Sequence, residues 1–243
     1  MTPLRSSLWA AIAATLRGEI AAGHYAPGDK LPTEAALAAR FRVNRHTVRH
    51  ALMALADERI THSRRGAGVF VTATPTDYPL GRRVRFHRNI TASGRTPSRV
   101  INRRETRPCD APEADALNIA PGNPVHVVEG LSLADGQPLA QFRSVFPGLR
   151  FPGLLAAMMD QPSVTAALAA CGLTDYTRAS TRISAERASA VQALALHLTE
   201  GAPLLRSVSV NIDAGGTPVE YGITWFAGDR VTLTLSDDGA ADV

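Results

Sequence analysis

The chain of 243 residues is 45% apolar and 20% charged, which are ordinary values for a globular protein, and its length favours two modest domains over one. No run approaches the roughly 20 apolar residues of a membrane span, and the distant cysteines Cys109 and Cys171 exclude a disulfide framework or a zinc site, so no metal or cofactor is expected. Residues 1–75 carry ten Lys or Arg against five Asp or Glu, whereas the rest of the chain is nearly neutral. This excess suits a module that binds an anionic polymer, although a solvated basic surface would show the same excess.

The first predicted helix ends near Ala22, and Gly23 is a plausible stop. Apolar residues recur at every fourth position and therefore share one helix face. These residues are Leu8, Ile12, Leu16 and Ile20. The segment resembles the apolar core of a secretion signal, but Arg17 and Glu19 interrupt it. We therefore expect a core-forming helix in a cytoplasmic protein that does not contact a membrane.

A second, short helix is predicted after the helix-breaking segment that ends at Pro32. Thr33 is a good amino-terminal cap, and Arg42 with Val43 forms the turn that follows. The apolar stripe of this helix consists of Leu37, Ala38 and Phe41. A helix of about two turns followed at once by a tight turn is the first half of a helix-turn-helix.

The third predicted helix follows Asn44, whose side-chain oxygen is able to cap it. Its inward face is formed by Val48, Leu52 and Leu55. Arg45 and Arg49 share an exposed face, where they repel each other unless an anion lies opposite. The second helix of a helix-turn-helix enters the major groove amino end first, where arginine reaches guanine and a hydroxyl bonds a phosphate. We predict that Arg45 and Arg49 read bases or phosphates and that Asn44 and Thr47 position phosphates; the alternative is a solvated face.

A two-stranded wing is predicted from Ile60 to Val71, where an alternating segment turns and continues as an apolar strand. Glycine at the tip lets the backbone approach a sugar-phosphate edge, and arginine supplies charge. The wing residues expected to contact DNA are Arg64, Arg65, Gly66 and Gly68.

The sequence LPTEAALAARFRVNRHTVRHAL followed by RRGAGVFV resembles the DNA-binding domain of the GntR family of bacterial transcription regulators. The resemblance covers residues 6–75 and implies a winged helix-turn-helix in which Thr33 also contacts double-stranded DNA. Many members carry an arginine directly after the glutamate of this motif, whereas this chain has Ala35. The resemblance therefore implies that Arg45, Arg49 and the wing carry more of the binding.

Residues 76–83 contain proline, glycine and small polar residues and are predicted to be a linker. Beyond it, the strand-like segments are Pro124–Leu133, Pro138–Phe146, Leu204–Ile212, Val219–Phe226 and Val231–Leu235. The helical segments are Pro112–Leu117, Ser163–Ala170 and Ala185–Leu198. ADGQP and DAGGTP look like hairpin turns, so we predict an α+β domain with one mostly antiparallel sheet and helices on one side of it.

The order PGNPVHVVEGLSLADGQPLAQFRSVFP and then TPVEYGITWFAGDRVTL resembles the UTRA effector-binding domain of the HutC subgroup of GntR regulators, over residues 84–236. This implies a chorismate-lyase-like fold. RRVRFHRNITASGRTPSRV and RASTRISAERASA resemble regulators of phosphonate uptake and breakdown in that subgroup. The implied protein is a homodimeric repressor that a small-molecule effector, such as a phosphonate or phosphate ester, releases from a two-fold symmetric operator.

A pocket for a phosphonate needs guanidinium groups, together with a carboxylate for any amine on the ligand. By the resemblance, the effector-binding residues are Arg85, Phe86, His87, Arg143, Arg178, Glu220 and Phe226. The alternative for each of them is a surface ion pair or a core aromatic residue, since alternation along a strand sends half of any cluster to the wrong face.

Sugar-phosphate-sensing members have two arginines on the strand before the ADG hairpin, where this chain has Gly130 and Ser132. Either Arg143 and Arg178 replace them, or the ligand is less anionic than a phosphate. A non-phosphorylated ligand such as urocanate or another organic acid therefore stays an alternative.

Two other classes of function fit the sequence less well. A lyase-type enzyme is disfavoured because no nucleophile and base stand out and no metal spacing is present. A chromosome-architecture protein has little reason for a second domain with a candidate pocket. We therefore expect a DNA-binding regulator with no catalytic residues.

Overall fold

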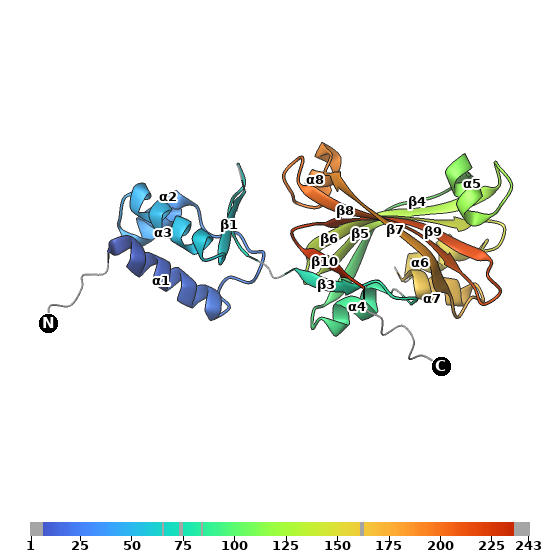
Figure 1. Cartoon of the computed structure of the whole chain (residues 1–243), viewed down its shortest axis with the longest axis horizontal. Coiled ribbons are helices and arrows are strands. Elements are labelled where there is room, and N and C mark those ends of the chain that lie inside the picture. The colour runs from blue at the N-terminus through green and yellow to red at the C-terminus, as the bar shows by residue number, and fades with distance from the viewer. Residues whose placement is uncertain (1–6, 65, 73–74, 84, 161–162, 236–243) are drawn as a thin grey trace. The chain divides into compact units, whose positions relative to one another are not determined.

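The computed structural model describes residues 7–64, 66–72, 75–83, 85–160 and 163–235. They form two compact units, residues 1–74 and residues 75–243 (Figure 1). Among the described residues, no helix combines the length and apolar character needed to cross a bilayer. The same residues contain no group of three or more His, Cys, Asp and Glu side chains suited to a metal ion.

The first unit consists of three helices and a two-stranded wing. Its elements are α1 Leu8–Ala21, α2 Glu34–Phe41, α3 Arg45–Asp57, β1 Thr61–Arg64 and β2 Gly68–Val71. Leu16, Leu37, Val48 and Leu55 are fully buried in one core. Leu8 was expected on the buried face but is 62% exposed, because it is the first residue of α1 and lies beyond the core. The predicted helix-turn-helix with a wing is confirmed.

The turn between α2 and α3 forms as its sequence predicts. Thr33 caps α2, since its hydroxyl accepts a hydrogen bond from the Ala36 amide at 3.2 Å. Arg42 ends that helix in the left-handed conformation, with a φ of 53°. Asn44 then caps α3 by accepting a hydrogen bond from the Thr47 amide at 2.8 Å. These caps satisfy amides that a helix terminus would otherwise leave unpaired.

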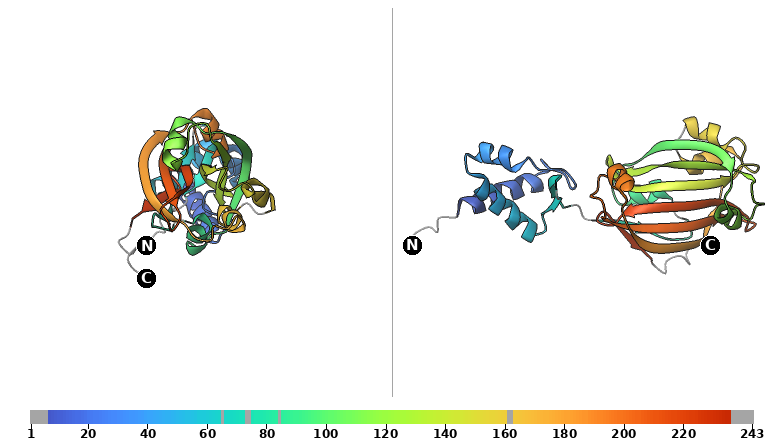
Figure 2. Two further views of the ribbon diagram at one scale, coloured as in Figure 1. Left: turned by 90° about the vertical axis from the view of Figure 1, so that its right-hand side faces the viewer. Right: turned by 90° about the horizontal axis from the view of Figure 1, so that it is seen from above.

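The second unit is built on a six-stranded antiparallel sheet. Its strands are β4 Pro97–Pro108, β5 Pro124–Ala134, β6 Gln137–Pro147, β7 Thr177–Arg187, β8 Pro203–Ile212 and β9 Pro218–Ala227. They lie in the order β4-β5-β6-β9-β8-β7 (Figure 2). Asp135 and Gly136, with φ of 50° and 75°, form the tight turn between β5 and β6, as expected for a hairpin.

Helices cover both faces of this sheet, so the prediction of helices on one side is wrong (Figure 1). On one face lie α4 Phe86–Ala92, α6 Leu154–Asp160 and α7 Val164–Ala170. On the other face lie α5 Ala111–Leu117, which packs on Val127 and Val145, and α8 Ala190–Ala195, which packs near Trp225. Because side chains alternate along strands, these two helices bury the residues that point away from α4, α6 and α7.

Two other segments differ from the sequence-based expectation. Residues 76–83, expected to be a linker, begin with strand β3 Thr76–Pro79, which pairs in parallel with β10 Val231–Thr234. The segment Ala185–Leu198, expected to be one helix, starts at the end of β7 and is helical only in α8. Ser189 caps that helix and so fixes its start.

Candidate DNA interface and effector pocket

The amino end of α3 presents a short hydrogen-bonded cluster to solvent. The Asn44 side-chain oxygen accepts hydrogen bonds from the amide and the hydroxyl of Thr47, at 2.8 and 2.9 Å. The side-chain nitrogen of Asn44, Nδ2, stays available as a donor, whereas the Thr47 hydroxyl already donates within the cap. Of the two predicted phosphate-positioning residues, Asn44 is therefore the better donor.

Arg49 is held by a carboxylate that the sequence analysis did not assign. Its Nε and a terminal nitrogen donate to Glu34 at 3.0 and 2.8 Å, and this pair lowers the pKa of Glu34. Arg45 is exposed, and its positive charge also lowers the pKa of Glu34. Glu34 is therefore the anion opposite the two arginines, so their proximity does not by itself require DNA.

The wing is braced by aromatic contacts and by the only lysine of the chain. The Arg64 guanidinium carbon lies 4.6 Å from the centre of the Phe70 ring. Gly66 and Gly68 have positive φ values of 75° and 118°. A Cβ on Gly68 would lie 2.8 Å from Cε of Lys30, so this cation, which the sequence analysis missed, crosses the wing. Arg65 lies outside the described residues.

A groove joins the start of α2 to the wing tip. Its lining includes Lys30, Thr33, Glu34, Gly66 and Gly68. It follows that Thr33 lies next to the wing, where a polymer that contacts the wing tip would also pass.

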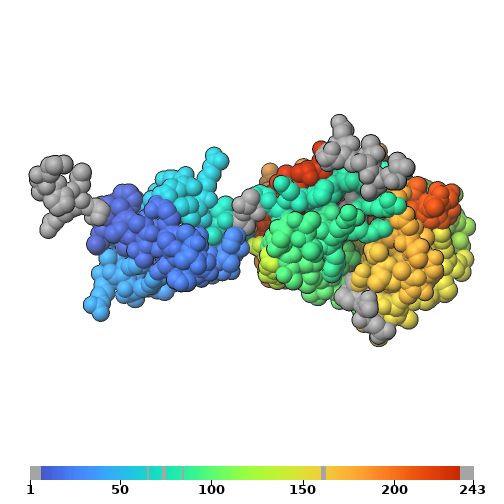
Figure 3. All heavy atoms as spheres, turned by 90° about the horizontal axis from the view of Figure 1, so that it is seen from below, coloured from blue at the N-terminus to red at the C-terminus, as the bar shows by residue number. Residues whose placement is uncertain are grey.

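The second unit contains a cavity of about 110 Å³ on the sheet face covered by α4 and α7. In Figure 3, α4 is part of the green surface and α7 part of the gold surface. Of the predicted effector residues, the cavity is lined by Arg85, Phe86, His87, Arg178 and Glu220. Lining residues that the sequence analysis missed include Tyr78, Arg99, Phe142, Tyr176 and Asn211.

A chain of hydrogen bonds crosses the floor of the cavity. Arg178 Nε donates to Asn211 Oδ1 at 3.0 Å, and Asn211 Nδ2 donates to Glu220 Oε2 at 2.7 Å. Burial lowers the pKa of Arg178, which nevertheless stays charged because the ordinary pKa of arginine is so high. Asn211 therefore separates the partly buried cation of Arg178 from the buried carboxylate of Glu220.

The wall contributed by α4 and its neighbours is aromatic and cationic. Arg85 donates to the Tyr176 carbonyl at 3.2 Å, and its guanidinium carbon lies 3.7 Å from the centre of that ring. The Tyr176 hydroxyl lies 3.0 Å from the Thr165 hydroxyl. Burial and the nearby charge of Arg99 lower the pKa of His87, so its imidazole is neutral at pH 7.

Two predicted effector residues do not line the cavity. Arg143 is the cross-strand partner of Ile223, and its side chain points to the opposite face of the sheet, where Glu113 and Glu129 bind it at 3.3 and 3.5 Å. Phe226 is buried behind the cavity, with its ring centre 5.1 Å from that of Tyr78. Alternation along β6 explains the error for Arg143, since the neighbouring Phe142 is the one that lines the cavity.

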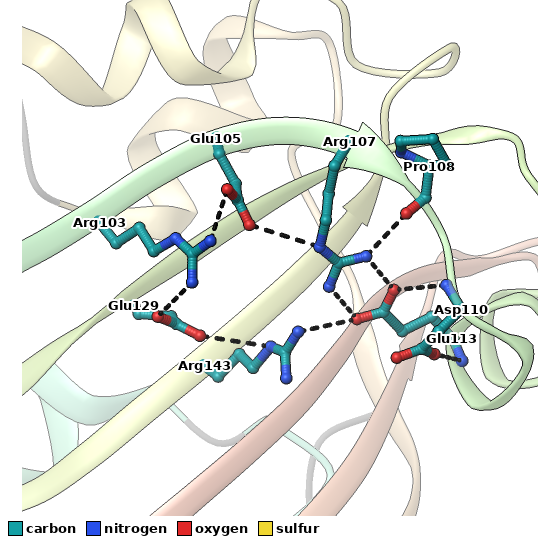
Figure 4. A network of polar contacts seen from close by, with 8 residues as sticks. All are labelled: Arg103, Glu105, Arg107, Pro108, Asp110, Glu113, Glu129 and Arg143. Atoms are coloured by element: carbon teal, nitrogen blue, oxygen red, sulfur yellow. Dashed lines mark hydrogen bonds and ion pairs between the residues drawn. The ribbon is translucent and has the colours of Figure 1, made fainter. Parts of the chain in front are cut away.

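Arg143 belongs to an ion-pair network on that opposite face (Figure 4). Glu113 is only 2% exposed and binds both Arg107, at 2.6 Å, and Arg143. The network also contains Arg103, Glu105 and Glu129. These six side chains join α5 to β4, β5 and β6, which is a structural role.

Comparisons with known proteins match both units. The model of the bacterial regulatory proteins of the gntR family matches residues 8–71, and the UTRA domain model matches residues 92–232. The chain is 39% identical over 230 residues to an uncharacterized HTH-type transcriptional regulator of Rhizobium meliloti, with 94% of each chain covered. It is 35% identical over 225 residues to the probable transcriptional regulator PhnF of Escherichia coli, with 92% of each covered.

A solved structure shows the same architecture. The crystal structure of PhnF from Mycobacterium smegmatis matches with a TM-score of 0.64 at 25% identity, covering 93% of this chain and 98% of that chain. The similarity therefore extends over both units.

Proposed function

Because this chain belongs to the GntR family of bacterial regulatory proteins and carries a UTRA domain, we propose that it is a repressor whose operator binding is released by a small anionic effector. The chain is a transcription regulator and not a lyase-type enzyme, since the relatives found are regulators of this family. The observation that carries the effector proposal is the cavity of the second unit, which Arg85, Arg99 and Arg178 line.

In the proposed DNA complex, the amino end of α3 enters the major groove. Arg45 and Arg49 read bases or phosphates, and Asn44 donates to a phosphate. The wing glycines and Arg64 follow the backbone on one side. Lys30 is added to this set because its side chain lies across Gly68.

Two chains are proposed to bind one operator as a homodimer. One chain carries one recognition helix, and a two-fold symmetric operator needs two of them, roughly one helical turn or a multiple apart. Effector binding then favours an arrangement of the chains that no longer matches the spacing of the half-sites.

The effector is proposed to be a phosphonate or a phosphate ester. In support, two regulators named PhnF are 35% and 28% identical to the chain over most of its length. A doubly charged head suits three guanidinium groups. An organic acid such as urocanate is the second candidate, supported by the neutral His87 and the aromatic wall, which suit a flat ligand.

The test is operator release. Fluorescence anisotropy of a labelled operator with the full chain is followed while ethylphosphonate, glycerol phosphate or urocanate is added. A lower operator affinity with either of the first two supports the proposal. Release by urocanate alone would reject the phosphonate assignment, and no release by any anion of the panel would reject an anionic effector.

A further inference from the structure

Arg99 places a guanidinium in the cavity with no ion-pair partner among the described residues, although the charge of Glu220 acts on it from a distance. The group comes from β4, and its carbon lies 4.7 Å from the centre of the Phe142 ring and 5.5 Å from that of Phe86. Its Nε is shielded from solvent and has no hydrogen-bond partner among the described residues. Burial lowers the pKa of Arg99, and the charge of Glu220 opposes this effect only in part. A shielded donor of a charged group is costly to leave without a partner, so an acceptor on a ligand would stabilise it.

The other two arginines of the cavity are already engaged. Arg178 donates to Asn211, and Arg85 donates to the Tyr176 carbonyl. Within the described part of the chain, no carboxylate lies within 4.0 Å of Arg99, the limit for an ion pair. Arg99 is therefore the guanidinium that keeps all of its donors for a ligand, whereas Arg85 and Arg178 keep only part of theirs.

The register of β4 and β5 explains why the cation comes from β4. Arg99 lies directly opposite Ser132 on the neighbouring strand. A Cβ on Gly130 would lie 2.1 Å from the Val100 carbonyl oxygen, next to an irregularity in the pairing after Ile101. No side chain fits at position 130, so β5 cannot present an arginine there without moving β4.

Glu220 adds a negatively charged carboxylate to the cavity that contains the Arg99 guanidinium. It is 9% exposed, and Asn211 donates to its Oε2. Among the described residues, no hydrogen bond reaches its Oε1. A buried carboxylate oxygen in this position suits a hydrogen-bond donor on the ligand, an ammonium or a hydroxyl group.

We propose that the effector is a small amphoteric molecule whose anionic head binds Arg99 between Phe86 and Phe142 and whose ammonium or hydroxyl group donates to Glu220; this rests on the proposed effector role of the cavity. The volume of about 110 Å³ limits such a ligand to a few atoms between the two groups. Arg99 then determines that an anion binds, and Glu220 determines which anion.

The test uses matched probes on the full chain. Isothermal titration calorimetry compares 2-aminoethylphosphonate, 2-hydroxyethylphosphonate and ethylphosphonate, which share one head. Wild type should bind the first or the second at least tenfold more tightly than ethylphosphonate. Glu220→Gln should weaken the ammonium probe at least tenfold, because the carboxylate that pairs with it is lost, but should keep a preference for the hydroxyl probe, since the glutamine oxygen still accepts a hydrogen bond. Ethylphosphonate, which donates nothing to Glu220, should bind no more weakly than to wild type.

Arg99→Met should weaken all three probes roughly 10- to 100-fold, as expected for the loss of a charged hydrogen bond. In the absence of ligand the same variant should melt at the same temperature as wild type or a higher one, because a guanidinium that makes no hydrogen bond or ion pair among the described residues has been replaced by an apolar side chain. A purely structural Arg99 would give a lower melting temperature. The control is Arg143→Met, on the other face of the sheet, which should leave all three affinities unchanged.

The possible failures are distinguishable. If wild type binds none of the three probes and neither glycerol phosphate nor urocanate, the proposed anionic effector itself fails. If wild type binds ethylphosphonate and Arg99→Met binds it equally well, the assignment of Arg99 is wrong while the proposed function stands. If wild type shows no preference among the probes, the role of Glu220 is wrong.

Discussion

Glu34 fixes the direction in which Arg49 leaves the recognition helix, because the two side chains share two hydrogen bonds. The side chains are 57% exposed for Arg49 and 33% for Glu34, so solvent screens the pair and it adds little to folding stability. Its effect should therefore lie in DNA recognition. Arg45 is exposed one turn earlier; it interacts with the charge of Glu34 but makes no hydrogen bond or ion pair among the described residues.

We predict that Glu34→Gln leaves the melting temperature nearly unchanged but lowers the ratio of specific to non-specific DNA affinity. Non-specific affinity should rise because a negative charge near the phosphates is lost.

Arg45→Ala should cost about 1 to 3 kcal/mol of specific binding if the Arg45 side chain reads a base. Anisotropy with operator and scrambled DNA measures both. Arg187→Ala, an exposed arginine of the second unit, is the control; unchanged ratios in Glu34→Gln would contradict the role of the pair.

The buried Glu113 predicts a pH dependence of stability. Burial raises the pKa of Glu113, but hydrogen bonds from Arg107 and the Asp110 amide outweigh it, so the pKa is lowered. A lowered pKa means that the carboxylate stabilises the fold above its ordinary pKa and loses this contribution as the pH falls through the lowered value. Glu113→Gln should therefore cost about 1 to 3 kcal/mol at pH 7, and the difference should shrink below about pH 4. Thermal unfolding across pH measures it; a constant difference would refute the explanation.

At the scale of elements, the sequence predicts the inner strands better than the edge strands. Apolar residues mark β5, β6, β8 and β9, and each was predicted to within about two residues of its ends. β4 and β7 are the edges of the sheet, and their side chains are mostly exposed, so they show no apolar alternation. The same gap explains why Arg99, on β4, was missed, whereas Arg178 and Glu220 were named from the family pattern.

The β4–β5 pairing makes a prediction about Gly130. Gly130→Ala would place a Cβ 2.1 Å from a backbone oxygen of β4, so the edge strand has to shift. We expect a loss of about 1 to 3 kcal/mol in unfolding free energy and a weaker response to anions, because Arg99 moves with β4. Gly18→Ala, whose Cβ would meet nothing within 4 Å, should instead be neutral or stabilising. Equal stability of the two variants would contradict the close approach.

At the scale of the whole molecule, the proposed dimer predicts how salt affects operator binding. Light scattering should give one operator bound by twice the 25.8 kDa chain. The slope of log affinity against log salt should be about twice as steep on a full operator as on a single half-site, because each recognition unit releases its own counter-ions. Equal slopes on the two DNAs would indicate that one chain binds alone.

The pairing of β3 with β10 has a consequence for protein engineering. β3 carries Tyr78, which lines the cavity. β3 pairs with β10, and the Thr76 amide also donates to the carbonyl of Arg230, the residue before β10. β10 itself lines no part of the cavity. A fragment meant to serve as an effector sensor must therefore start before Thr76 and extend past Thr234. A reporter inserted between β9 and β10 would displace β3, and with it Tyr78, although the insertion site does not line the cavity.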